Sequence, residues 1–132
     1  MKWERTNYSS GAPLEEKAGY SRVVKVGPFI FVGGTTSVQP DGTVYGENDG
    51  YAQTKYILEK MLDCLAKAGG SPGDVVRVKA YATDMKRAPE YARAYSEFFR
   101  EIKPLFTMVG IAALNRPSQL IEIEIDAVLS TI

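Results

Sequence analysis

The sequence of 132 residues contains no histidine and one cysteine, and both shortages narrow its chemistry. Without histidine, catalytic systems of the Ser-His-Asp and Cys-His types and HExxH zinc sites are excluded. The single cysteine, Cys64, excludes an intrachain disulfide and a thiolate metal cluster. It lies among apolar residues at helical spacing, so we expect a packed side chain rather than a reactive thiol.

An excess of one charge and long apolar runs are also missing. Sixteen basic and sixteen acidic residues give zero net charge without a basic run, so nucleic-acid binding through bulk electrostatics is disfavoured. No stretch approaches the roughly 20 apolar residues that cross a bilayer, and the opening residues are too polar for a signal peptide. We therefore expect a single cytoplasmic domain, residues 1–132, without a membrane or nucleic-acid partner.

The clearest pattern in the chain lies in its last quarter. Residues 120–126 alternate with a period of two, so isoleucines point to one face of a strand and acids to the other. The apolar face requires a core. The acids Glu122, Glu124 and Asp126 repel one another unless they face water or positive charge, so the polar face is where we look for function.

Periodicity and turn residues predict the other elements. Residues 1–19 are expected to be irregular. Strands are expected at residues 20–26 and 29–32, separated by Gly27-Pro28, at 74–83, and as a closing pair at 107–114 and 120–128 joined by a turn. Amphipathic helices are expected at residues 51–68, capped by Asn48 or Asp49, and at about 89–102.

This order predicts an α+β domain with a mixed sheet, in the order β-β-α-β-α-β-β, and both helices on one face because crossovers are right-handed. In the strand at 74–83, Val76 is expected to face the core with Val78, whereas Arg77 and Tyr81 face the uncovered side. That uncovered face is too apolar for plain surface and too charged for a core. We favour self-association through it, with clefts at subunit boundaries; a solvated face is the alternative.

Several segments, in their order along the chain, resemble the Rid family of reactive intermediate deaminases, also called the YjgF family. Ala12-Pro13 and then residues 19–24, GYSRVV, are similar to the family's opening AP and YSQAV. Residues 73–85 resemble its central strand, residues 95–99, YSEFF, its second helix, and residues 121–124, IEIE, its closing strand. The likeness covers nearly the whole chain.

The resemblance implies a homotrimer of chorismate-mutase-like subunits with a ligand cleft between neighbours. It implies hydrolysis of reactive enamines and imines, such as 2-aminoacrylate, to a 2-keto acid and ammonia, without a metal or organic cofactor. Residue by residue, the family's cleft tyrosine corresponds to Tyr20, its water-positioning glutamate to Glu122, and the glycine ending its second strand to Gly34. A small metabolite is thus the expected partner, besides other copies of the chain.

Other positions depart from the family pattern. Phe106 stands where the family has the arginine that clamps the substrate carboxylate, and phenylalanine cannot replace a bidentate ion pair. Gly33 replaces a serine, and Ala92 replaces an asparagine in the second helix. Arg116, in the turn before the last strand, is a candidate for reaching the cleft from another direction, or it is simply solvated.

Three functions are weighed on these observations. The first is a hydrolytic deaminase in which Glu122 positions water, Tyr20 and the Gly33-Gly34 backbone shape the cleft, and Phe106 packs on the substrate. The second is a trimer that binds a small metabolite without chemistry, which the missing arginine favours. A ribonuclease is disfavoured by zero net charge, the lack of histidine and the lack of an aromatic-basic stripe.

Overall fold

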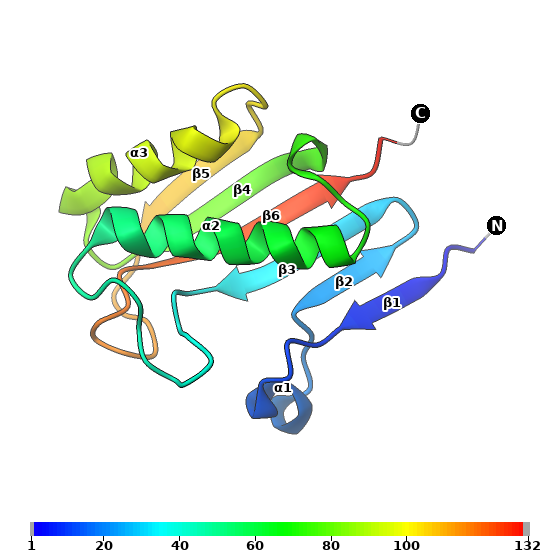
Figure 1. The fold of residues 1–132 in the computed structure, drawn as a ribbon, viewed down its shortest axis with the longest axis horizontal. Coiled ribbons are helices and arrows are strands. Elements are labelled where there is room, and N and C mark those ends of the chain that lie inside the picture. Colours follow the sequence, from blue (N-terminus) through cyan, green and yellow to red (C-terminus); the bar gives the residue numbers. More distant parts are fainter. Residues whose placement is uncertain (1, 131–132) are drawn as a thin grey trace.

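The computed structural model describes residues 2–130, which form one mixed sheet and three α-helices (Figure 1). The sheet has the order β1-β2-β3-β6-β4-β5, and only β4 and β5 are parallel. Its strands are β1 (Arg5–Tyr8), β2 (Val23–Val26), β3 (Phe29–Thr35), β4 (Val75–Ala82), β5 (Leu105–Gly110) and β6 (Ile121–Val128). The helices are α1 (Pro13–Ala18), α2 (Gly50–Lys67) and α3 (Ala88–Phe99). The predicted α+β class is confirmed.

The long helix α2 forms where the sequence predicts it. Asp49 caps its start, because its side chain accepts a hydrogen bond of 3.0 Å from the backbone N–H of Ala52. Its apolar residues recur at spacings of three and four and are buried on the side that faces the sheet; they are Ile57, Leu58, Met61 and Leu65.

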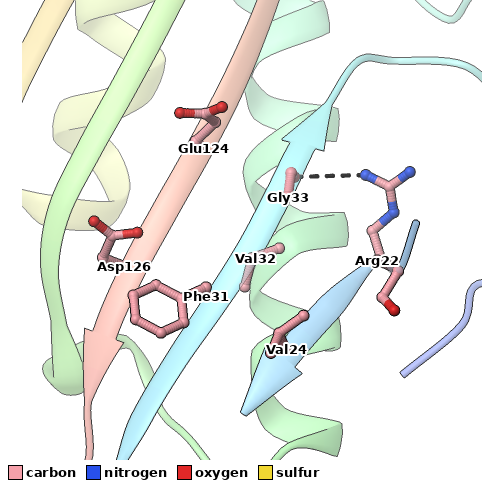
Figure 2. Close-up of a pocket in the computed structure, with 8 residues that line it drawn as sticks. Arg22, Val24, Phe31, Val32, Gly33, Glu124 and Asp126 are labelled. Carbon is pink, nitrogen blue, oxygen red and sulfur yellow. Dashed lines mark hydrogen bonds between the residues drawn. The ribbon is translucent and has the colours of Figure 1, made fainter. Parts of the chain in front are cut away.

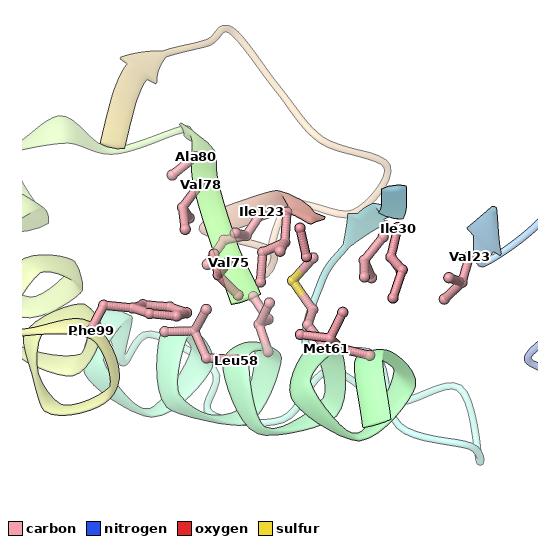
Figure 3. Packing of buried hydrophobic residues seen from close by; sticks show 14 of the residues in the cluster. Val23, Ile30, Leu58, Met61, Val75, Val78, Ala80, Phe99 and Ile123 are labelled. Carbon is pink, nitrogen blue, oxygen red and sulfur yellow. The ribbon is translucent and has the colours of Figure 1, made fainter. Parts of the chain in front are cut away.

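The core lies between the sheet and the two long helices, which cover the same face of the sheet (Figure 1). Leu58, Met61 and Phe99 point from the helices toward the strands (Figure 3). The alternate residues of β6 complete this layer, since Ile121, Ile123 and Ile125 are buried. The strict alternation predicted for this strand is confirmed.

The opposite face of the sheet carries the polar residues of β4 and β6. Arg77 forms an ion pair of 3.8 Å with Asp126, and the hydroxyl of Tyr81 donates a hydrogen bond of 3.0 Å to Glu124. Each pair lies on neighbouring strands that run antiparallel. The acids of β6 therefore meet positive charge and a hydrogen-bond donor, which offsets part of their mutual repulsion.

The N-terminal prediction is wrong, because residues 1–19 were expected to be irregular. Arg5–Tyr8 pairs with β2 as an antiparallel edge strand, and Pro13–Ala18 forms a short helix that buries Glu15. Neither segment buries an apolar stripe, so hydrophobic periodicity does not reveal them. The hydrogen bonds offered by the edge of β2 decide the strand.

Three details of the predicted strands also need correction. The last two strands do not form a hairpin, because β6 inserts between β3 and β4 while β5 pairs in parallel with β4. A register shift near the start of β4 turns Val76 out of the core, where Val75 takes its place. Gly33-Gly34 does not follow the second strand of the hairpin but lies inside it, since β3 continues to Thr35.

Candidate functional site

The site is built around Glu122, the first acid of β6 on the uncovered face. Its neighbour is an irregular stretch of β3, where the register shifts between Val32 and Thr35. A Cβ added to Gly34 would lie 2.7 Å from Oε2 of Glu122, so the carboxylate rests directly against the glycine backbone. Only a residue without a side chain leaves that space free. Because of the β-bulge and the missing side chain, the carboxylate of Glu122 packs directly against the backbone of Gly34.

Arg22 holds the other side of the bulge. Its Nη1 donates hydrogen bonds to the carbonyl of Gly34 at 2.6 Å and to the hydroxyl of Thr35 at 3.1 Å. It also donates weakly to the carbonyl of Gly33 at 3.5 Å, the bond drawn in Figure 2. The backbone adds a further link, since the N–H of Gly33 donates to the carbonyl of Arg22 at 2.9 Å. The guanidinium is therefore hydrogen-bonded to the same main-chain segment that the Glu122 carboxylate contacts.

Glu15 of α1 is the charge partner of Arg22, with Oε2 lying 3.9 Å from Nη2. The carboxylate is buried and accepts hydrogen bonds from the hydroxyls of Ser9 and Ser10 and from the N–H of Ser10. Burial alone would raise the pKa of Glu15, but these hydrogen bonds and the charge of Arg22 outweigh it and lower the pKa below its usual value. Glu15 is thus an ionised group inside the N-terminal segment.

The surroundings of Glu122 raise its pKa, whereas those of Glu15 lower the pKa of that group. Burial of its carboxylate, followed by the charge of Glu124, raises the pKa of Glu122, and the charge of Arg22 opposes this rise. On β4, Tyr81 is the register partner of Glu122, and burial together with its hydrogen bond to Glu124 raises the pKa of that phenol. A carboxyl group with a raised pKa and partial burial is suited to accept and return a proton.

A depression of about 260 Å³ lies on the uncovered face next to the β3 bulge, and its lining includes Glu124 of the same strand as Glu122 but not Glu122 itself (Figure 2). Its walls combine apolar side chains of β2 and β3 with carboxylates of β6. The lining residues are Ser21, Arg22, Val24, Phe31, Val32, Gly33, Glu124 and Asp126. The phenyl ring of Phe31 is 45% exposed, which is unusual for a residue in the middle of a sheet.

The structure brings together three of the six residues singled out by sequence, and Tyr20 lies close to them along the chain. Glu122 and Gly34 are in contact, and Gly33 is the next residue of the bulge. Tyr20 precedes Ser21, whose carbonyl would lie 3.6 Å from a Cβ at Gly33; the N–H of Tyr20 donates to the carbonyl of Glu15, and its side chain is 45% exposed.

The other two residues lie elsewhere in the chain. Phe106 is on the edge strand β5 and stacks on Tyr95 of α3, with ring centroids 4.1 Å apart. The guanidinium of Arg116 donates to the carbonyl of Gly42 in the loop before α2. Within residues 2–130, neither side chain forms a hydrogen bond or ion pair with Glu122.

Sequence reasoning missed the roles of Arg22 and Glu15. The only signal available was an arginine at the start of an otherwise apolar strand, Ser21-Arg22-Val23-Val24, because a buried strand rarely begins with an unpaired cation. Its partner Glu15 lies in the segment expected to be irregular. In the described part of the chain, no group of three or more histidine, cysteine or acidic residues is arranged to hold a metal ion.

Comparison with known proteins gives consistent matches over most of the chain. The family model described as endoribonuclease L-PSP matches residues 10–129. A RutC family protein of Pyrococcus abyssi is 37% identical over 105 residues, which cover 80% of this chain and 82% of that protein. The 3-aminoacrylate deaminase RutC of Acinetobacter baylyi is 31% identical over 106 residues, which cover 80% of this chain and 83% of that enzyme.

A solved structure agrees with the architecture. The crystal structure of a member of the YjgF/YER057c/UK114 family from Mycobacterium tuberculosis superposes with a TM-score of 0.86 and 38% sequence identity. The match covers 96% of this chain and 100% of that one. No helix formed by residues 2–130 has the length and apolarity that a membrane crossing requires.

Proposed function

The chain belongs to the YjgF or Rid family, and from this membership we propose that it hydrolyses reactive enamines or imines to a carbonyl compound and ammonia. A relative of similar length carries the name 3-aminoacrylate deaminase, so the reaction type is present among its relatives. The observation that carries the proposal is Glu122, a partly buried carboxyl group with a raised pKa set against the bare backbone of Gly34.

The chemistry needs one group that moves a proton in both directions. The reacting species is the iminium ion, an imine that has taken a proton from solvent; the carboxylate of Glu122 takes a proton from water while the water oxygen bonds to the iminium carbon, and the π-electron pair moves to nitrogen. The same carboxyl group then returns its proton to that nitrogen; the C–N bond breaks, ammonia leaves, and the hydroxyl loses its proton to solvent as the carbonyl forms. An enamine enters this sequence after its β-carbon takes a proton from solvent. No metal or organic cofactor is needed.

We propose that the working form is a homotrimer built through the uncovered face of the sheet. The face carries exposed apolar side chains in addition to its charges, which is typical of an interface rather than of free surface. Phe106 lies on the edge strand β5, where it is the register partner of the buried Val78 and stacks on Tyr95 of α3, so one subunit alone places its ring on the helix-covered side of the sheet and not beside Glu122. A boundary between subunits is the arrangement that joins the two.

Phe106 sets the expected substrate apart from that of a carboxylate-binding relative. Its ring is 38% exposed and stacks on Tyr95, so it offers an aromatic surface and no positive charge. Tyr20, Gly33 and Gly34 shape the rest of the proposed cleft. Arg116 is held at Gly42 and is left out of the site. We therefore expect ligands with an apolar or aromatic part at this point.

The experiment that tests this function couples a PLP-dependent dehydratase, which releases 2-aminoacrylate and related enamines, to detection of the keto acid. The wild type is compared with F106R, with E122Q, and with L14R as a matched control, because Leu14 is an exposed apolar residue of α1, outside the sheet. Acceleration by the wild type that E122Q abolishes supports the proposal. Acceleration by F106R alone means that the site keeps its chemistry for a different ligand.

The second candidate is a trimer that binds a metabolite without turning it over, which the absence of a cleft arginine at Phe106 favours. A ligand that raises the melting temperature and is recovered unchanged, with no turnover by the wild type or F106R, supports this reading. Turnover that E122Q abolishes contradicts it. The description endoribonuclease is not carried over to this chain, because zero net charge gives no bulk electrostatic attraction to RNA and so disfavours that function. The cytoplasmic location stays a prediction from sequence.

A further inference from the structure

The side chain of Arg22 is more buried and forms more hydrogen bonds than is usual for an arginine near a protein surface. Its side chain is only 16% exposed, and that of its partner Glu15 is 3% exposed, so the pair is largely removed from water. The Nε of Arg22 is buried without a hydrogen-bond partner in the described part of the chain. Burying a guanidinium in this way is unfavourable unless its other N–H groups form hydrogen bonds.

Those donors are directed at the β3 bulge. Nη1 reaches the carbonyl of Gly34 and the hydroxyl of Thr35, and that hydroxyl in turn donates to the carbonyl of Gly33 at 2.8 Å. Glycine backbone is otherwise the most mobile kind of main chain. Fixing two of its carbonyls orients the peptide planes on either side of Gly34.

Glu122 depends on this orientation because its carboxylate touches Gly34. The charged and titratable groups around it are few: Glu124 on its own strand, Tyr81 as its partner on β4, and Arg22 across β3. Among residues 2–130, the positive charge that opposes the raised pKa of Glu122 is that of Arg22. Arg22 therefore acts on Glu122 in two ways, through the position of the Gly34 backbone and through its own positive charge.

We propose that Arg22 is a positioning residue for Glu122: anchored by Glu15 of the N-terminal segment, it fixes the Gly33-Gly34 bulge and so sets the place of the carboxylate. The inference rests on the proposed function only in taking Glu122 as the proton-transferring group. Arg22 itself contacts main chain and Glu15 and is not expected to contact the ligand.

The test follows the side-chain carboxyl carbon of Glu122 by NMR as pH is varied, in the wild type, R22Q and R22K. R5Q is the matched control, since the side chain of Arg5 donates to the nearby Asn7 on an exposed strand. We expect R22Q to raise the midpoint of Glu122 by about half a pH unit or more, because a stabilising positive charge is lost. R22K keeps the charge and should shift the midpoint less, while amide hydrogen exchange at Gly34 becomes faster in both variants. R5Q should change neither readout.

An unchanged midpoint and unchanged exchange in R22Q overturn the proposal. If R22Q does not fold, E15Q replaces it: the guanidinium keeps its carbonyl partners but loses its countercharge, so the midpoint of Glu122 should fall, and no shift overturns the proposal. These readouts do not require turnover. A shifted midpoint in a protein without deaminase activity therefore supports this inference while contradicting the proposed function.

Discussion

At the scale of single residues, the site depends on the absence of a side chain at Gly34. The neighbouring Gly33 differs, because a Cβ there would meet its nearest atom, the carbonyl oxygen of Arg22, at an ordinary contact of 3.4 Å. The two glycines of the bulge thus have unequal roles. The family's serine in place of Gly33 would fit this backbone, whereas a side chain at Gly34 would displace the carboxylate.

The substitution G34A tests this difference. Its Cβ would lie 2.7 Å from Oε2 and 3.1 Å from Cδ of Glu122, so the flexible carboxylate must swing away. We expect the protein to fold, with a loss of about 1 kcal/mol in the free energy of unfolding, and to lose most of its turnover or ligand binding. Urea denaturation and the coupled keto-acid assay measure the two effects. G33A is the control, and an equal loss of activity in both variants would contradict the assignment.

The protonation of Glu122 also predicts a pH-dependent stability. Because its pKa is raised in the folded protein, mainly by burial, the folded state holds its proton more tightly than the unfolded chain does. The stabilising contribution of Glu122 to the free energy of unfolding is therefore fully present in acid, below the usual glutamate pKa. It is lost as the pH rises through the pKa that Glu122 has in the folded protein.

We accordingly expect E122Q to be more stable than the wild type at pH 7, because it removes the cost of a buried negative charge, and to lose this advantage in acid. Denaturation in urea at several pH values checks it. E124Q is a useful comparison, because Glu124 keeps a hydrogen bond from Tyr81. A difference between E122Q and the wild type that does not depend on pH would refute the explanation.

At the scale of elements, the helix α2 shows how local chemistry sets a boundary. Asn48 and Asp49 are both suitable caps by sequence, but the structure uses Asp49, while Asn48 adopts a positive φ of 61° and accepts a hydrogen bond from Arg87. The carboxylate of Asp49 also faces the positive end of the helix dipole.

We expect D49A to lower the free energy of unfolding by about 1 kcal/mol, since the N–H of Ala52 loses its partner. The matched control is E59A, an exposed change in the middle of the same helix, which should alter stability little. Thermal or urea unfolding measures both. Equal stability of D49A and the wild type would mean that water satisfies the helix end as well as the side chain does.

At the scale of the whole molecule, the uncovered face of the sheet is the surface through which we propose that copies of the chain associate. Phe31 is exposed near its centre, beside the carboxylates Glu124 and Asp126. An aromatic ring in this position gains free energy when another subunit covers it. The proposed trimer therefore depends on this face.

We expect the wild type to sediment as a trimer and F31E to dissociate toward monomers at micromolar concentration, because a further carboxylate beside Glu124 and Asp126 would be buried at the interface without a positive partner. The control L14E introduces the same charge at an apolar residue that is 54% exposed on α1, outside the sheet. Sedimentation velocity distinguishes the species. A monomeric wild type, or equal dissociation of both variants, would rule out the proposed interface.

Much of the fold was predictable because the relevant signals are local. The alternation in β6 and the helical spacing in α2 are written in adjacent residues, and each pattern has one physical solution, an apolar face turned to the core. The short β1 and α1 carry no such stripe. The hairpin expected at the C-terminal end failed for a different reason, since which strands pair depends on crossovers and not on periodicity.

The sequence by itself determined the α+β class, the two long helices and the polar face of β6. The resemblance to a known family added Glu122 and Gly34 as candidate site residues. Only the tertiary structure decided that Arg22 and Glu15 support them, and that Phe106 lies on the far edge of the sheet. The physical reason is that these contacts join segments far apart in the chain. They arise when β6 is inserted between β3 and β4, an arrangement that no local pattern of residues encodes.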